Sequence, residues 1–519
     1  MTSYSLKSLG HLAILMGAMQ MQMGCVEPND RDFEPGAGSG PVGSGGKTSS
    51  GGNTSTGSGG SSSPAGGMTS TAGSSAGGAI SSTGGSTSSS GGSTSSGGST
   101  SSGGSASGGG SASGGGSSSA GGPSGTPGAI NWGKEEDPGA KCPVTGTLPD
   151  FAALKADGKL PDPFLKLDGT RIKDKSEWAC RREEILKQLA KYIYGEKPIP
   201  AKGSVTGTVT ATKISVKVTE GTKTASFDVT VNMNGATAPA PAIISYGAGA
   251  SAPSGVAKIT FNAIEASGGS GAKTGPFYTF YGSNHPAGYM VAQAWQVSRI
   301  IDLLEQNPGV IDPYHVGLTG CSRNGKGAFA GGVFDNRIAL TIPCESGIGG
   351  SPALRLKEQL DPGANSTAEW PYHTISYVRW LSEVALGPFA TANDAAGDNT
   401  DKLPVDMHEA MALIAPRALY IVDNPSISNL DPKSAYVTGM AGKAIFTALG
   451  VPDNFTYQGA GGTHCTWRDA YTPSLNAVID KFLRGKDATK TGNFATDLGT
   501  KPDPTQYYSW STAELPGKL

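Results

Sequence analysis

The sequence carries little excess charge and lacks any run of basic residues. Its 40 lysine and arginine residues nearly balance its 42 aspartate and glutamate residues, which leaves a formal net charge of −2. Basic residues do not alternate with aromatic ones, as they do on many surfaces that bind nucleic acid. We therefore expect no nucleic-acid partner.

Cysteine and histidine are also scarce, with six of each in the chain. Their positions do not follow the short paired spacings that are typical of zinc sites. We therefore expect no metal centre.

The chain begins without an apolar run long enough to span a membrane, which needs about 20 residues. Lys7 precedes a shorter apolar run from Leu9 to Met19, a pattern that predicts a secretory signal over residues 1–25 and a secreted protein. Gly24-Cys25 fits a lipoprotein site in which acylated Cys25 anchors the protein at the cell surface, as in an outer-membrane lipoprotein. Gln22 stands where such sites usually have Leu, Val or Ile, so ordinary signal cleavage stays open.

Large apolar residues are almost missing from Gly36 to Pro127, where Gly, Ser and Thr repeat. Such a segment cannot bury enough surface to offset its ordering entropy. Residues 26–135 therefore indicate a disordered linker. A coil of this composition and roughly 90 residues has an r.m.s. reach of about 50 Å, so it would serve either as a working tether or as a mere spacer.

Residues 136–519 alternate strand and helix patterns. Because that alternation favours a sheet covered on both faces, we expect an α/β-hydrolase fold, a three-layer αβα sandwich. Helices are predicted at 176–194 and around Val297–Leu304, and a hairpin over 205–231 turns at 220–222. Buried strands are predicted at 242–245, in the segment leading into Ser322, and at 338–342, 418–422 and 455–457.

One short segment at the end of a predicted strand has the features of a nucleophile elbow. Gly320-Cys321-Ser322 follows an apolar run and precedes a helical pattern, so Ser322 would sit in a sharp turn at a helix N-terminus. There the backbone N–H groups and the helix dipole favour an oxyanion. The second glycine, Gly325, falls one place later than usual, so this spacing fits an ordinary glycine-rich turn equally well.

The wider sequence resembles the glucuronoyl esterases, carbohydrate esterase family fifteen. The resemblance covers roughly residues 140 to 485. It rests on four segments, which are Gly-Cys-Ser-Arg-Asn-Gly-Lys-Gly-Ala at 320–328, Ile-Pro-Cys-Glu-Ser-Gly-Ile-Gly-Gly at 342–350, His-Glu-Ala-Met-Ala-Leu-Ile-Ala-Pro-Arg at 408–417, and Gly-Thr-His-Cys at 462–465.

Ester hydrolysis by Ser322 needs a histidine base and a carboxylate that orients it. His464 follows the last strand in a glycine loop, where this fold places its base. His408 precedes an apolar helical run and is expected to be structural, although the resemblance, which includes it, leaves a supporting role near the site open. Asp423 directly follows a strand, at the usual position of the catalytic acid in α/β-hydrolases, which favours it as the acid. The family resemblance favours Glu345, which we take as the acid, with Asp423 as a substitute or second acid.

The resemblance also implies roles for two cations. Arg323 would stabilise the oxyanion, and Lys326 would contact the hydroxyls of the uronate sugar. The simpler interpretation of each is a solvated charge in the first helical turn. The chain departs from the family in two places, since Asn429 stands where a sugar-pocket tryptophan is expected and an expected Gln/Glu pair has no clear match between Asn365 and Glu383.

The cysteines suit an oxidising compartment. By resemblance to the family, we expect one disulfide between Cys321 and Cys465 and another between Cys142 and Cys180. Because the signal accounts for Cys25, Cys344 would be a buried free thiol.

The sequence therefore predicts a monomeric serine esterase that needs no cofactor. The resemblance implies that it cleaves the ester between (4-O-methyl-)glucuronic acid of glucuronoxylan and a lignin alcohol, through a glucuronoyl-enzyme intermediate. Two alternatives stay open, which are another carbohydrate esterase that acts on acetyl esters and a non-catalytic carbohydrate-binding surface protein.

Overall fold

The computed structural model describes residues 134–137, 147–262, 272–362, 368–376, 378–390 and 399–519. Contacts between residues divide the chain into Met1–Ser124 and Gly125–Leu519, and all described residues belong to the second unit. The predicted signal, Cys25, most of the predicted linker and Cys142 lie outside the described residues.

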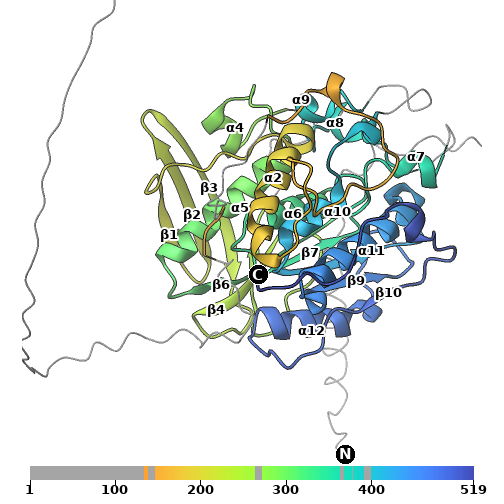
Figure 1. Cartoon of the computed structure of the whole chain (residues 1–519). Helices are drawn as coiled ribbons and strands as arrows, with labels where there is room; N and C mark the ends of the chain where they lie inside the picture. The colour runs from red at the N-terminus through yellow and green to blue at the C-terminus, as the bar shows by residue number, and fades with distance from the viewer. Residues whose placement is uncertain (1–133, 138–146, 263–271, 363–367, 377, 391–398) are drawn as a thin grey trace, which may run out of the picture. The chain divides into compact units, whose positions relative to one another are not determined.

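The described residues form a ten-stranded sheet in the order β1-β2-β3-β5-β4-β6-β7-β8-β9-β10 (Figure 1). From β5 to β10 every neighbouring pair is parallel, whereas β1, β2, β3 and β5 pair in antiparallel fashion. The strands are β1 (Val205–Val209), β2 (Lys213–Glu220), β3 (Lys223–Asn232), β4 (Ala240–Ser245), β5 (Ala257–Thr260), β6 (Ile311–Cys321), β7 (Leu340–Cys344), β8 (Ala418–Asp423), β9 (Phe455–Gly459) and β10 (Phe494–Thr496).

Helices cover both faces of the parallel part of the sheet. Successive residues of a strand point to opposite faces, so Ile243 packs with the α12 side chains while Ile244 joins the larger core under α5, α6 and α10. This arrangement confirms the predicted αβα sandwich. The helices are α2 (Trp178–Leu189), α4 (Pro276–Tyr281), α5 (Tyr289–Gln306), α6 (Arg323–Phe334), α7 (Lys357–Leu360), α8 (His373–Ser376), α9 (Glu383–Leu386), α10 (Met407–Ile414), α11 (Pro432–Ala448) and α12 (Thr472–Phe482).

Most predicted elements form close to the expected positions. Strands β2 and β3 make the expected hairpin, with Glu220 opposite Lys223, and β2 alternates exposed and buried side chains. Helix α2 begins at Trp178 rather than Ser176, and its continuation Ala190–Tyr194 is π-helical. The prediction missed β5 and β10, because strands of four and three residues are too short to show a period in the sequence. Within the described residues, no helix combines the length and apolar character that crossing a bilayer requires.

The register of the parallel strands brings their carboxyl ends to one edge. Cys321 pairs with Cys344 across β6 and β7, and Asp423 pairs with Gly459 across β8 and β9. The residues that directly follow these strands therefore emerge side by side. This edge holds Ser322, Glu345 and the loop that carries His464.

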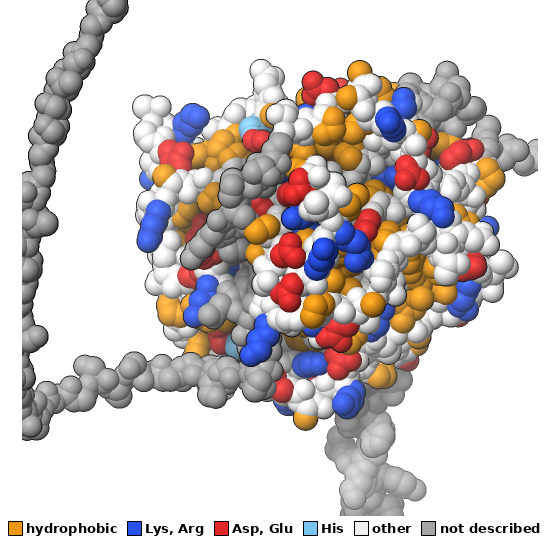
Figure 2. Space-filling model, in the orientation of Figure 1, with side chains coloured by type: hydrophobic (Ala, Val, Ile, Leu, Met, Phe, Trp, Pro, Cys, Tyr) orange, Lys and Arg blue, Asp and Glu red, His pale blue; other side chains and the backbone are white. Residues whose placement is uncertain are grey.

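The surface drawn in Figure 2 intersperses acidic, basic and apolar side chains. Exposed ion pairs such as Lys213–Asp228, at 3.1 Å, contribute only about 0–1 kcal/mol each. The buried ion pairs below this surface matter more to the fold, because removing one partner leaves an uncompensated charge.

A buried ion-pair network fixes the start of the described chain to the sandwich. Glu136 is only 8% exposed and forms ion pairs with Lys197, Arg299 and, at 3.7 Å, Arg337. Burial raises the pKa of the Glu136 carboxyl, but Lys197 and Arg299 outweigh burial and hold the pKa below its usual value of 4.5. The carboxylate thus neutralises several buried cations at once.

We predict that Glu136→Gln lowers the free energy of unfolding by about 3–5 kcal/mol at neutral pH, because it leaves these cations without their shared anion. A depressed carboxyl pKa contributes stability above the unfolded value and loses it as the pH falls through the folded value. The deficit should therefore shrink below pH 4.5. Urea unfolding of the wild type and the variant at several pH values measures this difference.

Asp228→Asn is the matched control, because Asp228 pairs with Lys213 at 3.1 Å and the two side chains are 60% and 55% exposed. We expect it to leave the free energy of unfolding nearly unchanged. Equal losses in the two variants would contradict the role assigned to burial.

Candidate functional site

Ser322 occupies the turn between β6 and α6, as the sequence predicts. Its backbone has φ 57° and ψ −129°, a conformation that is strained for a residue with a Cβ. The turn is closed by the Ser322 N–H, which donates to the Cys344 carbonyl, and by the Lys326 N–H, which donates to the Ser322 carbonyl, both at 3.0 Å. Ser322 is therefore held at the N-terminus of α6 by its own backbone.

Gly320 and Gly325 make this turn sterically feasible. A Cβ at Gly320 would lie 2.3 Å from the Asn324 carbonyl oxygen, and one at Gly325 would lie 2.4 Å from the Cys344 carbonyl oxygen. The glycine at 325 thus lets α6 pack closely on the end of β7. This close packing explains a glycine one place later than the usual elbow spacing.

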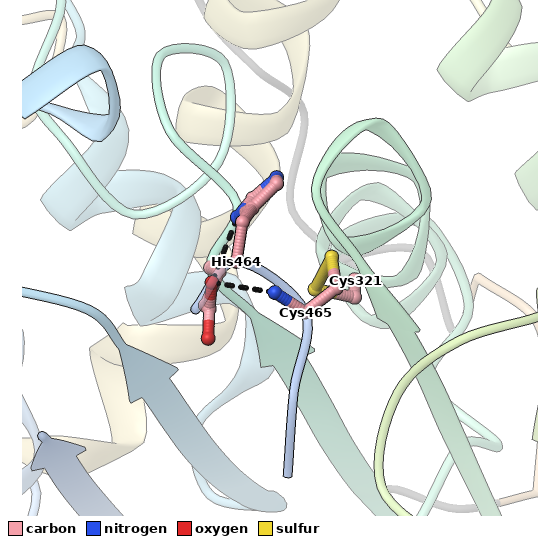
Figure 3. Close-up of side chains that lie close together, drawn as sticks. Cys321, His464 and Cys465 are labelled. Carbon is pink, nitrogen blue, oxygen red and sulfur yellow. Dashed lines mark hydrogen bonds and ion pairs between the residues drawn. A yellow bond between two sulfur atoms is a disulfide. The ribbon is translucent and has the colours of Figure 1, made fainter. Parts of the chain in front are cut away.

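A disulfide joins the Ser322 turn to the His464 loop, as the resemblance implies. Cys321 and Cys465 are bonded across a sequence separation of 144 residues, with their Cα atoms 5.8 Å apart. Each half-cystine directly neighbours a predicted catalytic residue. Figure 3 shows the bridge beside the His464 ring.

Glu345 follows β7 and is the carboxylate that His464 contacts. Its Oε2 lies 2.8 Å from His464 Nδ1 and accepts from the Cys465 N–H at 2.9 Å (Figure 3), while Asn424 donates to the same oxygen at 3.3 Å. The second oxygen, Oε1, accepts from Arg468 at 2.8 Å. Burial raises the pKa of Glu345, but hydrogen bonds from His464 and Arg468 outweigh it, so the pKa lies below the usual value.

Asp423 lies nearby but in a different environment. Its carboxylate accepts from the Tyr457 hydroxyl at 2.7 Å and from the Asn424 N–H at 2.9 Å. Burial raises the pKa of Asp423 to about 6, against the lowering effect of the Tyr457 hydroxyl. The structure thus brings Glu345, and not Asp423, into contact with His464.

The site's donor set does not fit a metal ion. Among the described residues, Cys321, Glu345, His464 and Cys465 place potential ligand atoms within 4.8 Å of one another. The two sulfur atoms, however, are joined to each other and offer no thiolate. The remaining pair already forms a hydrogen bond.

Lys326 projects from the first turn of α6 and is buried rather than solvated. It is 1% exposed, donates to the Ile348 carbonyl at 2.8 Å and to Glu369 at 2.5 Å, and lies 4.8 Å from the centre of the Trp380 ring. Burial lowers the pKa of Lys326, and Glu369 opposes that shift. Arg323 begins α6 directly after Ser322 and is partly exposed.

The sequence relationship agrees with this geometry. The family model described as "Glucuronyl esterase, fungi" matches residues 216–450. A 4-O-methyl-glucuronoyl methylesterase of Hypocrea jecorina (strain QM6a) is 37% identical over 389 residues, which span 73% of this chain and 80% of that protein. The chain belongs to the glucuronoyl esterase family.

Solved structures of other glucuronoyl esterases share the fold. The glucuronoyl esterase catalytic domain from Hypocrea jecorina superposes with a TM-score of 0.64 at 34% identity, covering 71% of this chain and all of that domain. A Ser→Ala mutant of the glucuronoyl esterase from Sporotrichum thermophile, in complex with methyl 4-O-methyl-β-D-glucopyranuronate, matches with a TM-score of 0.61 at 35% identity. That match covers 68% of this chain and 94% of the mutant enzyme.

Three polar residues of this glucuronoyl esterase site were missed by the sequence analysis. Asn424 and Arg468 contact Glu345, and Glu369 pairs with Lys326 within the segment where no match for the family pair was recognised. Arg468 and Glu345 are 123 residues apart, so no local pattern links them. The backbone carbonyl of Asn429 accepts from the Glu369 N–H at 2.9 Å.

The structure also shows the surroundings of Cys344, His408 and Cys180. Cys344 is a buried free thiol whose pKa burial raises to about 12, as expected for an unreactive position. His408 is fully buried beside the Pro161 carbonyl, and burial lowers its pKa to about 4, which fits the expected structural role. Cys180 is disulfide-bonded, but the predicted partner Cys142 lies outside the described residues, so that pairing stays a prediction.

We predict that replacing Glu345 by its amide lowers activity far more than replacing Asp423 by its amide. Glu345→Gln should lower kcat/KM for an activated ester by about 10³–10⁴, because the amide no longer stabilises the charged imidazole. Asp423→Asn should lower it less than about tenfold, since this side chain bonds Tyr457 rather than His464. Steady-state kinetics of both variants measures the difference. A larger loss in Asp423→Asn than in Glu345→Gln would reverse the assignment.

The raised pKa of Asp423 predicts a pH-dependent stability. A carboxyl whose folded pKa exceeds its unfolded value of 3.8 stabilises the fold below that value and loses its contribution as the pH rises through about 6. Two pKa units correspond to about 3 kcal/mol. Wild-type unfolding free energies should therefore lose about this much from about pH 3 to about pH 7 relative to Asp423→Asn. Parallel pH profiles for the two proteins would contradict the shift.

Proposed function

We propose that this chain hydrolyses the ester that links (4-O-methyl-)glucuronic acid of glucuronoxylan to an alcohol, in plant biomass a lignin alcohol. The observation that carries the proposal is the contact between His464 and Glu345 in a loop that the Cys321–Cys465 disulfide ties to Ser322. Membership of the glucuronoyl esterase family supports the substrate class.

In the proposed reaction, Ser322 attacks the uronoyl carbonyl while His464 takes its proton. The oxyanion that forms lies at the N-terminus of α6, where the Arg323 N–H and guanidinium would stabilise it. His464 then protonates the leaving alcohol, and the C–O bond breaks to give a glucuronoyl ester of Ser322. Water attacks this ester with His464 again as base, which releases the uronic acid and restores the serine.

Glu345 supplies the fixed negative charge that each imidazolium step requires. Its four hydrogen bonds hold the pKa below the usual value of 4.5, so the carboxylate is ionised at neutral pH. A protonated acid would carry no charge and could not stabilise the imidazolium. The low pKa and the 2.8 Å contact together support Glu345 as the catalytic acid of the triad.

Lys326 is the proposed contact to the sugar. It is one helical turn from Ser322, and Glu369 and the Ile348 carbonyl fix its ammonium in place. A fixed donor costs less entropy on binding than a solvated one. The pair with Glu369 offers both a donor and an acceptor for sugar hydroxyls near the serine.

The remaining assignments concern the whole chain. We propose that residues 1–25 are a signal peptide, residues 26–135 a linker and residues 136–519 the catalytic domain, that the enzyme is secreted and monomeric, and that Cys25 carries a lipid anchor. The Cys321–Cys465 disulfide supports secretion, because structural disulfides persist in oxidising compartments.

Benzyl glucuronate and 4-nitrophenyl acetate distinguish the proposed reaction from an acetyl esterase. We predict that the purified protein hydrolyses benzyl glucuronate with the higher kcat/KM, and that Ser322→Ala lowers this value by at least about 10⁴. Product release followed by chromatography measures both rates. Preferential cleavage of the acetate, or unchanged hydrolysis in the variant, would contradict the proposal.

A further inference from the structure

Arg468 and His464 contact different oxygens of the Glu345 carboxylate. Its Nη1 donates to Oε1 at 2.8 Å, whereas His464 and the Cys465 N–H use Oε2. Glu345 is 2% exposed and the Arg468 side chain 13%, so water screens this ion pair little. Arg468 therefore binds the carboxylate oxygen that the imidazole does not contact.

The same guanidinium holds the loop that carries His464. Arg468 Nε donates to the Gly461 carbonyl at 2.9 Å, Nη2 to the Thr463 carbonyl at 3.0 Å and Nη1 to the Thr466 carbonyl at 3.1 Å. These carbonyls lie on both sides of His464 in the sequence. Arg468 thus cross-links the two halves of the loop by hydrogen bonds and also pairs with Glu345.

Gly462 leaves room for the Arg468 guanidinium. Its φ is +149°, and a Cβ there would lie 2.7 Å from Arg468 Nε. A larger residue would have to displace the guanidinium. The glycine of this loop is therefore matched to the arginine six residues later.

The titratable groups around Glu345 come from the ends of β7, β8 and β9. His464 and Arg468 lie on the loop after β9, and Cys344 precedes Glu345 on β7. Tyr471 accepts from Arg468 at 3.2 Å, and Asp423 ends β8 beside Asn424. Burial raises the pKa of Cys344 and that of Tyr471 to about 12 and that of Asp423 to about 6. Of these groups, Arg468 is the permanent cation.

We propose that Arg468 is a positioning residue for the reaction: by pairing with the free oxygen of Glu345 it fixes the carboxylate toward His464 and shares its charge. This inference rests on the proposed function. A carboxylate that shares its charge with no cation would attract the positively charged imidazolium more strongly than one paired with Arg468 does. With Arg468 in place, part of the carboxylate charge is neutralised and Oε2 stays directed at His464 Nδ1, 2.8 Å away.

The test uses Arg468→Gln and Arg468→Lys in the full chain, with two readouts at each pH. One is kcat and KM for benzyl glucuronate. The other is the rate at which a fluorophosphonate labels Ser322, which needs a neutral base but no uronate. Arg171→Gln is the control, because it removes the same charge from an ion pair with Asp162 at 2.9 Å.

We expect Arg468→Gln to move the acidic midpoint of both profiles up by about one pH unit and to lower the plateau kcat about tenfold, with KM within about twofold. Arg468→Lys should restore the midpoint, because it keeps the charge. It should restore only part of kcat, because lysine lacks the planar set of N–H donors of a guanidinium. Arg171→Gln should match the wild type.

An unshifted midpoint in Arg468→Gln, or an equal shift in Arg171→Gln, would overturn the inference. If Arg468→Gln fails to fold, Arg468→Lys decides, and a wild-type kcat in that variant would overturn the positioning role. Labelling of wild-type Ser322 without hydrolysis of benzyl glucuronate would refute the proposed substrate alone, and the labelling midpoints would still test Arg468.

Discussion

The buried Glu345 carboxylate is the constraint on which the site depends. A charge at 2% exposure is stable only if donors surround it, and four of them do so from two segments. His464, Cys465 and Arg468 come from the loop after β9, and Asn424 comes from the end of β8. The donors that lower the pKa of Glu345 are thus the groups that fix the loop carrying His464, so the stability of the fold and the proposed catalysis rest on the same contacts.

The sandwich supplies the framework for this constraint. Parallel strands place Ser322, Glu345 and the end of β8 along one edge, and the disulfide closes the site by joining the turn after β6 to the loop after β9. Ser322, Glu345 and Cys465 all have positive φ, although none is glycine. Such conformations persist only where surrounding contacts fix them, and they cluster at functional sites. Here the close packing of α6 on β7 and the bridge provide those contacts.

The sequence predicted the parts of the fold and site that have local signals. Alternating strand and helix patterns predict the sandwich, and the loop after the last predicted strand favours His464. The glycines around Ser322 fit an elbow and an ordinary turn equally well, so the family resemblance was needed to choose the elbow. The choice between Glu345 and Asp423 needed either the family resemblance or the structure, because both follow buried strands and only three-dimensional contacts separate them. Arg468 and Glu369 had no local signal, since their partners lie 123 and 43 residues away. Short β5 and β10 were missed because pairing with neighbours, rather than their own period, makes them strands.

The central claim is that Ser322 carries the uronoyl group during turnover. The most direct measurement is to mix the enzyme with benzyl glucuronate, quench in acid within the first turnover, and locate the added mass by peptide mass spectrometry. We expect a glucuronoyl adduct on the peptide that contains Ser322, formed together with a burst of benzyl alcohol and lost as hydrolysis proceeds. A burst without an adduct on Ser322, or an adduct on another residue, would contradict it.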